Sequence, residues 1–243
     1  MKRTLFFLTG LLMIVLSTAA QSPDTENRQR SLVVFTFDDA AESHRSVVAP
    51  LLKEYGFGAT FYICEFPGFE NKEHYMTWEQ IRQISDMGFE IGNHGQSHRN
   101  MSAMTRDEIV RDIAYIEDKC AELGIPHPVT YAYPGYKTSE EGWEVLRERG
   151  YRYARHGGDK PYVKGTVDSL MLPSYAIHNR NDRTLEFLKT VLEETNGETV
   201  ILTFHGVPDL AHPHVDTTPE DFRAILDYLK QNHYRVVALK DLE

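Results

Sequence analysis

Two adjacent acids follow the first apolar run of the chain, in the stretch VVFTFDDA that ends at Ala40. If both carboxylates were buried without a counterion, they would repel each other and one would tend to stay protonated. A divalent cation removes this conflict, because it binds one carboxylate and lowers the pKa of both. The other carboxylate of the Asp38–Asp39 pair is then free to act as a base toward water. The alternative is that the acids cap the helix that begins near Ser43, although that serine already serves this helix as a cap.

Imidazoles stand at two further strand ends. His94 and His98 lie four residues apart in IGNHGQSH, and on a helical turn this spacing places both rings on one face, where they can share a cation. A polar surface turn is the ordinary explanation for such a pair on its own. Two histidines and one carboxylate form a facial triad that leaves positions open for water and substrate. His205, in ILTFHG, adds a third imidazole after a late apolar run.

Alternating strands and helices must position these residues. Amphipathic helical patterns separate most of the apolar, β-rich runs, and capping signals mark helix starts at Thr77 and at Thr218-Pro219. Repeated alternation favours a parallel sheet, and seven or eight units favour closure into a barrel, with an open doubly wound sheet as the alternative. Sites in such folds form at the carboxyl ends of the strands. The predicted strands are Leu32–Phe37, Ala59–Ile63, Phe89–Gly92, Val129–Tyr133, Tyr151–Ala154, Leu170–Ala176, Thr199–Phe204 and Arg235–Ala238.

Length and charge limit the class of protein. The chain has 243 residues, of which 41% are hydrophobic, and this suffices for one well-packed domain. A net charge of −10 disfavours nucleic acid or an anionic membrane as a partner, since both reward a basic surface. Two cysteines, Cys64 and Cys120, exclude a cysteine-based zinc site. An oxidising compartment would permit a disulfide between them, but we expect two buried free thiols.

The N-terminal segment has the pattern of an export signal. Lys2 and Arg3 precede an apolar stretch from Leu5 to Leu16, and small residues follow directly. This order is typical of a cleaved signal peptide, predicted over residues 1–20, with an uncleaved anchor or an interior helix as the alternatives. The apolar stretch is short for a membrane span. We therefore expect an exported protein, periplasmic or extracellular, that keeps no membrane span after cleavage.

Three ordered motifs carry a family resemblance. The chain has TFDD, then H-x-x-x-H, then L-x-x-H from Leu202 to His205. In this order they resemble the polysaccharide deacetylase superfamily, the NodB-homology group that includes the family 4 carbohydrate esterases. The likeness extends from about Leu32 to the end of the chain. It implies an α/β fold, a distorted (β/α)7-8 barrel, forming a single catalytic domain over residues 31–243 after a short N-terminal extension, residues 21–30.

The resemblance also implies roles for the motif residues. Asp39, His94 and His98 would hold one divalent metal ion, most often Zn²⁺, although the ligand types also permit Co²⁺, Ni²⁺, Mn²⁺ or Fe²⁺. Asp38 would be the catalytic base, and His205 would protonate the leaving group.

A third motif is expected to supply the oxyanion contacts. It corresponds to Pro134, Gly135 and Tyr136, and a backbone N–H near Gly135 would help to hold the oxyanion. The aromatic residue that usually follows the proline is displaced here by one position.

The implied function is hydrolysis of acetyl groups on a sugar. The partner would be an acetylated glycan or polysaccharide, with N-acetyl groups favoured and O-acetyl groups open. Hydrolysis of a non-sugar linear amide is an alternative within the same chemistry. Two other classes share the features: a carbohydrate-binding pseudoenzyme of the same fold, and an Fe(II) oxygenase that uses two histidines and a carboxylate. The sequence does not define the oligomeric state.

Several positions depart from the family pattern. Ala40 stands where the family often has glycine, and Gly95 stands where it often has serine or threonine. The arginine that usually begins the third motif and orients the base is replaced by Ala132. Arg155 or Arg180 is a candidate for the missing guanidinium. No Asp-and-Trp pair matches the fourth motif, where the chain has LPSYAIHNRND.

A second histidine cluster occurs in HGVPDLAHPHVD, which contains His212, His214 and Asp216 besides His205. It would form either a second metal site or, as we expect, a rim loop that contacts substrate or solvent. His178 and the remaining histidines are interpreted as ordinary surface or packed residues. Four aromatic residues are candidates either for stacking on sugar rings or for core packing: Tyr62, Trp78, Tyr133 and Tyr136.

Overall fold

The computed structural model describes residues 31–180, 183–195 and 197–242. The predicted signal peptide, residues 1–20, and the predicted extension, residues 21–30, lie outside the described residues. Within the described ranges, none of the helices combines the length and the apolar character that a membrane span requires.

Eight strands form one sheet, and every pairing between them is parallel. The strand order is β5-β4-β3-β2-β1-β7-β6, and β8 pairs with β1 outside this path. All eight predicted strands are present, although most are shorter than predicted. Their bounds are β1 Val33–Phe37, β2 Thr60–Ile63, β3 Glu90–Asn93, β4 Thr130–Ala132, β5 Tyr153–Arg155, β6 Tyr175–Ala176, β7 Val200–Phe204 and β8 Val236–Val237.

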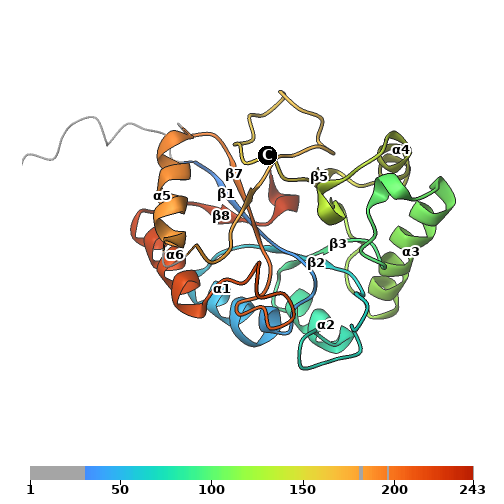
Figure 1. Ribbon diagram of the computed structural model, residues 1–243, viewed down its shortest axis with the longest axis horizontal. Coiled ribbons are helices and arrows are strands. Elements are labelled where there is room, and N and C mark those ends of the chain that lie inside the picture. Colours follow the sequence, from blue (N-terminus) through green and yellow to red (C-terminus); the bar gives the residue numbers. More distant parts are fainter. Residues whose placement is uncertain (1–30, 181–182, 196, 243) are drawn as a thin grey trace, which may run out of the picture.

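The seven-strand path curls into a half-barrel, which confirms the predicted (β/α)7-8 architecture over an open doubly wound sheet. A parallel bridge between Arg155 and Leu172 joins the edge strand β5 to the chain just ahead of β6. The β5–β6 connection contains no helix between residues 156 and 174, so this part of the barrel departs from regular strand–helix alternation (Figure 1).

In the part of the chain that the structure describes, six α-helices surround the sheet on its outer side (Figure 1). Two predicted caps are present: the Thr77 hydroxyl accepts a hydrogen bond from the Gln80 N–H, and the Thr218 hydroxyl accepts one from the Asp221 N–H. The predicted cap at Ser43 is wrong, because its hydroxyl accepts the Val207 N–H instead, at 2.8 Å. The helices are α1 Ala49–Tyr55, α2 Trp78–Asp86, α3 Arg106–Glu122, α4 Glu140–Glu148, α5 Thr184–Glu194 and α6 Pro219–Gln231.

The core has two sides because side chains alternate across each strand. On β1, Phe35 and Phe37 pack outward against helices, with Phe222 of α6 6.3 and 5.8 Å from them between ring centroids. Val34 faces the barrel interior, where residues of neighbouring strands such as Ile201 also pack. Burial on both faces holds the strands in register, so their carboxyl ends meet at one rim.

Both cysteines, Cys64 and Cys120, are buried and free. The expected pair of free thiols is therefore confirmed, and no disulfide joins them.

Gly95, at the start of the loop between β3 and α3, has a positive φ of 71°. A methyl group at this position would overlap the Asp112 carboxylate, which accepts hydrogen bonds from the Ser97 N–H at 2.9 Å and hydroxyl at 2.6 Å. The serine or threonine common in the family at this position would not fit against Asp112.

Alanine at any left-handed backbone position lowers the free energy of unfolding. We predict that Gly95→Ala lowers it by about 1 kcal/mol or more in addition to that loss. Gly56→Ala is the matched control, because Gly56 also has a φ of 71° and an added methyl group would meet no described atom within 4 Å. Urea unfolding in the presence of a chelator would compare the two variants. Equal losses would contradict the proposed overlap with Asp112.

Candidate metal centre

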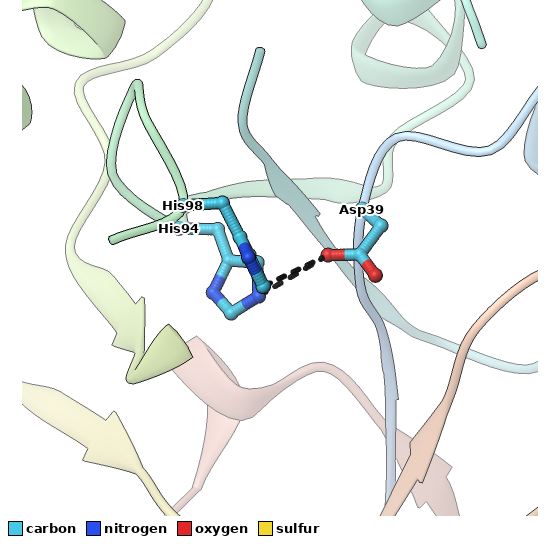
Figure 2. Close-up of side chains that lie close together, drawn as sticks. All are labelled: Asp39, His94 and His98. Atoms are coloured by element: carbon cyan, nitrogen blue, oxygen red, sulfur yellow. Dashed lines mark ion pairs between the residues drawn. The ribbon is translucent and has the colours of Figure 1, made fainter. Parts of the chain in front are cut away.

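Three side chains from two loops converge at the rim of the barrel. The Asp39 carboxylate follows β1, and its Oδ1 lies 3.4 Å from His94 Nε2 and 3.5 Å from His98 Nε2 (Figure 2). One ligand atom from each residue lies within 4.8 Å of the other two. Asp39 and His94 are buried, and His98 is partly buried. One oxygen and two imidazole nitrogens gathered at this spacing form a donor set suited to a divalent cation.

The ring of His94 is oriented by the neighbouring strand. Its Nδ1 lies 2.7 Å from the Ala132 carbonyl oxygen at the end of β4. A carbonyl accepts only, so Nδ1 carries the proton and donates it. The bond to this carbonyl leaves Nε2 as the ring nitrogen that faces Asp39 and that would bind a metal.

His98 reaches the centre from an irregular loop. The predicted helical turn over residues 94–98 is wrong: Gly95 and His98 both have positive φ, 71° and 50°. The left-handed residues turn the chain so that both rings face Asp39, with centroids 4.9 Å apart. The ring of Phe66 stacks on His98 at a centroid distance of 4.1 Å and covers its outer side.

The backbone of the aspartate pair is strained. Asp39 and Ala40 have φ values of 74° and 53°, a region that costs residues with a Cβ about 1–2 kcal/mol each. The usual glycine at the position of Ala40 would adopt this conformation without strain. Neither acid caps a helix; the Asp38 N–H donates to the Phe204 carbonyl at 2.9 Å, and both carboxylates face the rim. The capping interpretation is therefore wrong.

Asp38 is paired with a fully buried guanidinium. Nη2 of Arg155 lies 2.6 Å from both carboxylate oxygens of Asp38. Arg155 ends β5, and its Cα is the registered partner of Ala132 on β4. Registered residues of a parallel sheet point to the same face, so a guanidinium from β5 occupies the space beside the small Ala132. The other candidate, Arg180, donates to the Ala176 carbonyl and packs on Phe187.

The charges of the cluster favour ionised acids. Burial alone would raise the pKa of Asp38, but Arg155, His94 and His205 outweigh it, and the pKa is lowered. Burial also opposes ionisation of Asp39, yet its hydrogen bond with His94 and the nearby imidazoles lower its pKa. Burial and the adjacent His94 lower the pKa of His98 to about 4. Burial opposes protonation of His94, but Asp38 and Asp39 outweigh it and raise the pKa of His94. Ionised Asp39 and neutral His98 are in the states that a metal requires, and a bound cation would displace the Nε2 proton of His94.

His205 lies on the opposite side of Asp39, with its Nε2 3.6 Å from Oδ2. Its backbone carbonyl accepts a hydrogen bond from His44 Nε2 at 3.0 Å. Burial lowers the pKa of His44 to about 4, so its ring is neutral and can donate to that carbonyl from Nε2. Together with the Ser43 contact to Val207, this bond ties the loop after β1 to the loop after β7. The sequence contained no local signal for His44, because its partner is 161 residues away.

A cavity of about 470 Å³ opens above these side chains. The third motif contributes Gly135 and Tyr136 to its wall, whereas Pro134 is buried beneath. Gly135 is the second residue of a tight turn, Pro134–Tyr136, and the first N–H groups of such a turn have no acceptor within it. The cavity is lined by Asp38, Asp39, Phe66, His94, His98, Tyr133, Gly135, Tyr136, Ala176, Ile177, His178, His205, His212, His214 and Val215.

The remaining predicted residues divide between the cavity wall and the core. Tyr133 and Tyr136 reach the cavity, whereas Tyr62 is buried inside the barrel and Trp78 donates to Glu65 at 2.8 Å. The second metal site considered for the late histidine cluster is not formed: among the described residues, the triad with Asp39 is the one group with metal-ligand geometry.

Comparison with known proteins agrees with this fold. The family model for polysaccharide deacetylase matches residues 25–154. The chain therefore belongs to the polysaccharide deacetylase family.

Individual relatives are distant. A peptidoglycan-N-acetylglucosamine deacetylase of Bacillus cereus is 23% identical over 215 residues, which cover 87% of each chain. A peptidoglycan deacetylase of Helicobacter pylori is 29% identical over 110 residues, or 42% of this chain and only 36% of the relative. Among solved structures, a CE4 family pseudoenzyme from Bacillus anthracis superposes with a TM-score of 0.62 at 17% identity, covering 88% of this chain and 66% of the other. The structural likeness supports the fold alone.

We predict that Asp39→Ala, His94→Ala and His98→Ala each weaken Zn²⁺ and Co²⁺ binding by more than the roughly 10- to 100-fold typical of lost outer-shell contacts. Competition with a chromogenic chelator would measure the affinities. His205→Gln is the matched control, because His205 also contacts Asp39 but stands outside the triad. Wild-type affinity in Asp39→Ala, or an equal loss in His205→Gln, would contradict this ligand set.

Proposed function

We propose that the chain is a metal-dependent hydrolase that removes acetyl groups, chiefly N-acetyl groups, from a glycan. One observation carries the proposal: three metal ligands, Asp38 and His205 all line the same cavity. This set provides a cation site together with two groups able to transfer protons. Export to the periplasm or the exterior, as indicated by residues 1–20, belongs to the same proposal.

A divalent cation, in our proposal zinc, supplies Lewis acidity toward a carbonyl oxygen and toward water. Asp38 accepts the proton of the attacking water, and Arg155 keeps it ionised and fixes the plane of its carboxylate. In this proposal, the Gly135 N–H donates to the oxyanion that develops on the former carbonyl oxygen. His205 donates a proton to the departing amine nitrogen, which leaves poorly without it.

The same residues distinguish this proposal from the alternatives. A carbohydrate-binding pseudoenzyme would have no function for an ionised Asp38 and a His205 in the same cavity as the cation site. An Fe(II) oxygenase would have no function for Asp38 or for His205 beside the triad. Both observations favour hydrolysis.

We predict that the purified protein releases acetate from N-acetylated glucosamine oligomers. Removal of bound metal with a chelator should abolish the release, and added Zn²⁺ or Co²⁺ should restore it. Acetate release from acetylated xylan, measured in parallel, would separate N-acetyl from O-acetyl specificity. Full activity after thorough metal removal, verified by elemental analysis, would overturn the proposal.

Arg155 offers a sharper test, because its partner position on β4 is known. We predict that Arg155→Ala lowers kcat by about 100-fold or more with little change in KM or metal content, since the base loses its orienting group. The double variant Ala132→Arg/Arg155→Ala supplies a guanidinium from β4 instead of β5, and it should recover part of the lost kcat. Thermal melts would show whether each variant is folded.

The single variant Arg180→Met serves as the control, because Arg180 contacts neither acid. Equal kcat values for Arg155→Ala and wild type would remove Arg155 from the mechanism. A folded double variant with no recovery would show that a guanidinium from β4 cannot replace it.

A further inference from the structure

Two histidines on the cavity wall have no function in the chemistry proposed above. His178 follows β6, and His214 lies in the long loop between β7 and α6. Within the described part of the chain, neither ring makes a hydrogen bond or an ion pair; the one ring contact of His214 is with His212, at a centroid distance of 6.2 Å. Each imidazole therefore keeps a free donor and a free acceptor at the wall of the cavity.

The loops that carry these two residues are held together. The Asn179 N–H donates to the Asp216 carbonyl at 2.6 Å, which ties the residue after His178 to the loop of His214. The buried Asp209 braces the second loop, since its carboxylate accepts the N–H groups of Ala211 and His212 at 3.1 and 2.7 Å. The imidazoles are thus presented from backbone that is fixed before any ligand arrives.

The surface beside them is apolar. Phe66, Ile177 and Val215 line the same cavity. A wall that combines aliphatic and aromatic carbon with a few hydrogen-bonding groups suits a pyranose ring, whose faces are apolar and whose edge carries hydroxyls.

No lysine or arginine lines the cavity within the described residues. Two arginines considered for the site have other partners: Arg155 is fully buried against Asp38, and Arg180 donates to the Ala176 carbonyl. Burial, and then the charge of Arg180, lower the pKa of His178, so its ring is neutral near pH 7. Apart from the proposed cation, the described cavity wall therefore offers a carboxylated sugar no lysine or arginine as a partner.

We propose that His178 and His214 form a subsite that hydrogen-bonds the hydroxyls of an uncharged N-acetylated sugar, and that the cavity disfavours sugars that carry a carboxylate. This inference rests on the proposed deacetylase function of the same cavity. His178 and His214 belong neither to the metal triad nor to the proton-transfer pair, so the subsite would determine which sugar is bound.

The first test compares His178→Ala and His214→Ala with wild type on a tetramer of N-acetylglucosamine. Each variant should raise KM by about 3- to 10-fold, the value of one lost hydrogen bond, while kcat and zinc content stay unchanged. His127→Ala is the matched control, because His127 is exposed and precedes β4 at the opposite end of the barrel. Unchanged KM in both subsite variants would overturn the proposed contacts.

The second test uses an oligosaccharide in which N-acetylglucosamine alternates with N-acetylmuramic acid, and mass spectrometry locates each lost acetyl group. Wild type should deacetylate the neutral sugar at least about 10-fold faster. Converting the lactyl carboxylate to its amide, which keeps the size and removes the charge, should reduce that preference. Equal rates at both sugars, or a preference unaffected by the amide, would overturn selection by charge.

These outcomes remain distinct from failure of the proposed function. If zinc binds and no substrate releases acetate, the deacetylase proposal fails. If wild type releases acetate, but the variants keep the wild-type KM and the charged sugar reacts as fast as the neutral one, only the subsite proposal fails.

Discussion

The structure depends on the electrostatic cost of two carboxylates placed side by side in a buried rim. Asp38 and Asp39 are 3% and 4% exposed, so solvent cannot screen their repulsion. The protein resolves the conflict in two ways: Arg155 neutralises Asp38 at 2.6 Å, and imidazoles gather around Asp39 to form a cation site. The neutralising groups come from different strands, so each acid has its own partner. In the proposed mechanism, that separation lets Asp39 hold a metal while Asp38 stays free for proton transfer.

The barrel provides the geometry that this division requires. Parallel strands end at one rim, and short loops there bring residues from β1, β3, β5 and β7 within hydrogen-bonding or ligand distance. The strained backbone of Asp39 and Ala40 directs the Asp39 carboxylate into the site. Packing of β1, which is buried on both faces, stabilises this conformation. His44 and Ser43 then fix the loop of His205 against the loop of the acids. The site is therefore rigid on the sides that carry the proposed chemistry.

Strand–helix alternation was sufficient to predict the barrel. The positions of the acids and histidines after predicted strands were sufficient to predict which residues converge, because strand ends in a parallel sheet share one edge. The local backbone conformation could not be predicted from the sequence. The turn over residues 94–98 is irregular rather than helical, since Gly95 and His98 adopt left-handed backbone that spacing alone does not reveal. The partner of Asp38 was narrowed to Arg155 or Arg180, and only the cross-strand register with Ala132 decides between them. His178 gave no signal, because its environment is built by a loop distant in sequence.

The pairing of β1 with β7 has a consequence for the growing chain on the ribosome. Val33 through Phe37 match Val200 through Phe204 along the whole length of both strands. All three metal ligands are synthesised more than a hundred residues before this partner. Until β7 emerges, a strand that is fully buried in the folded protein has an open edge, the kind of surface that aggregates or engages chaperones. Nascent chains of this protein are thus expected to need shielding before they can mature, whatever metal is available.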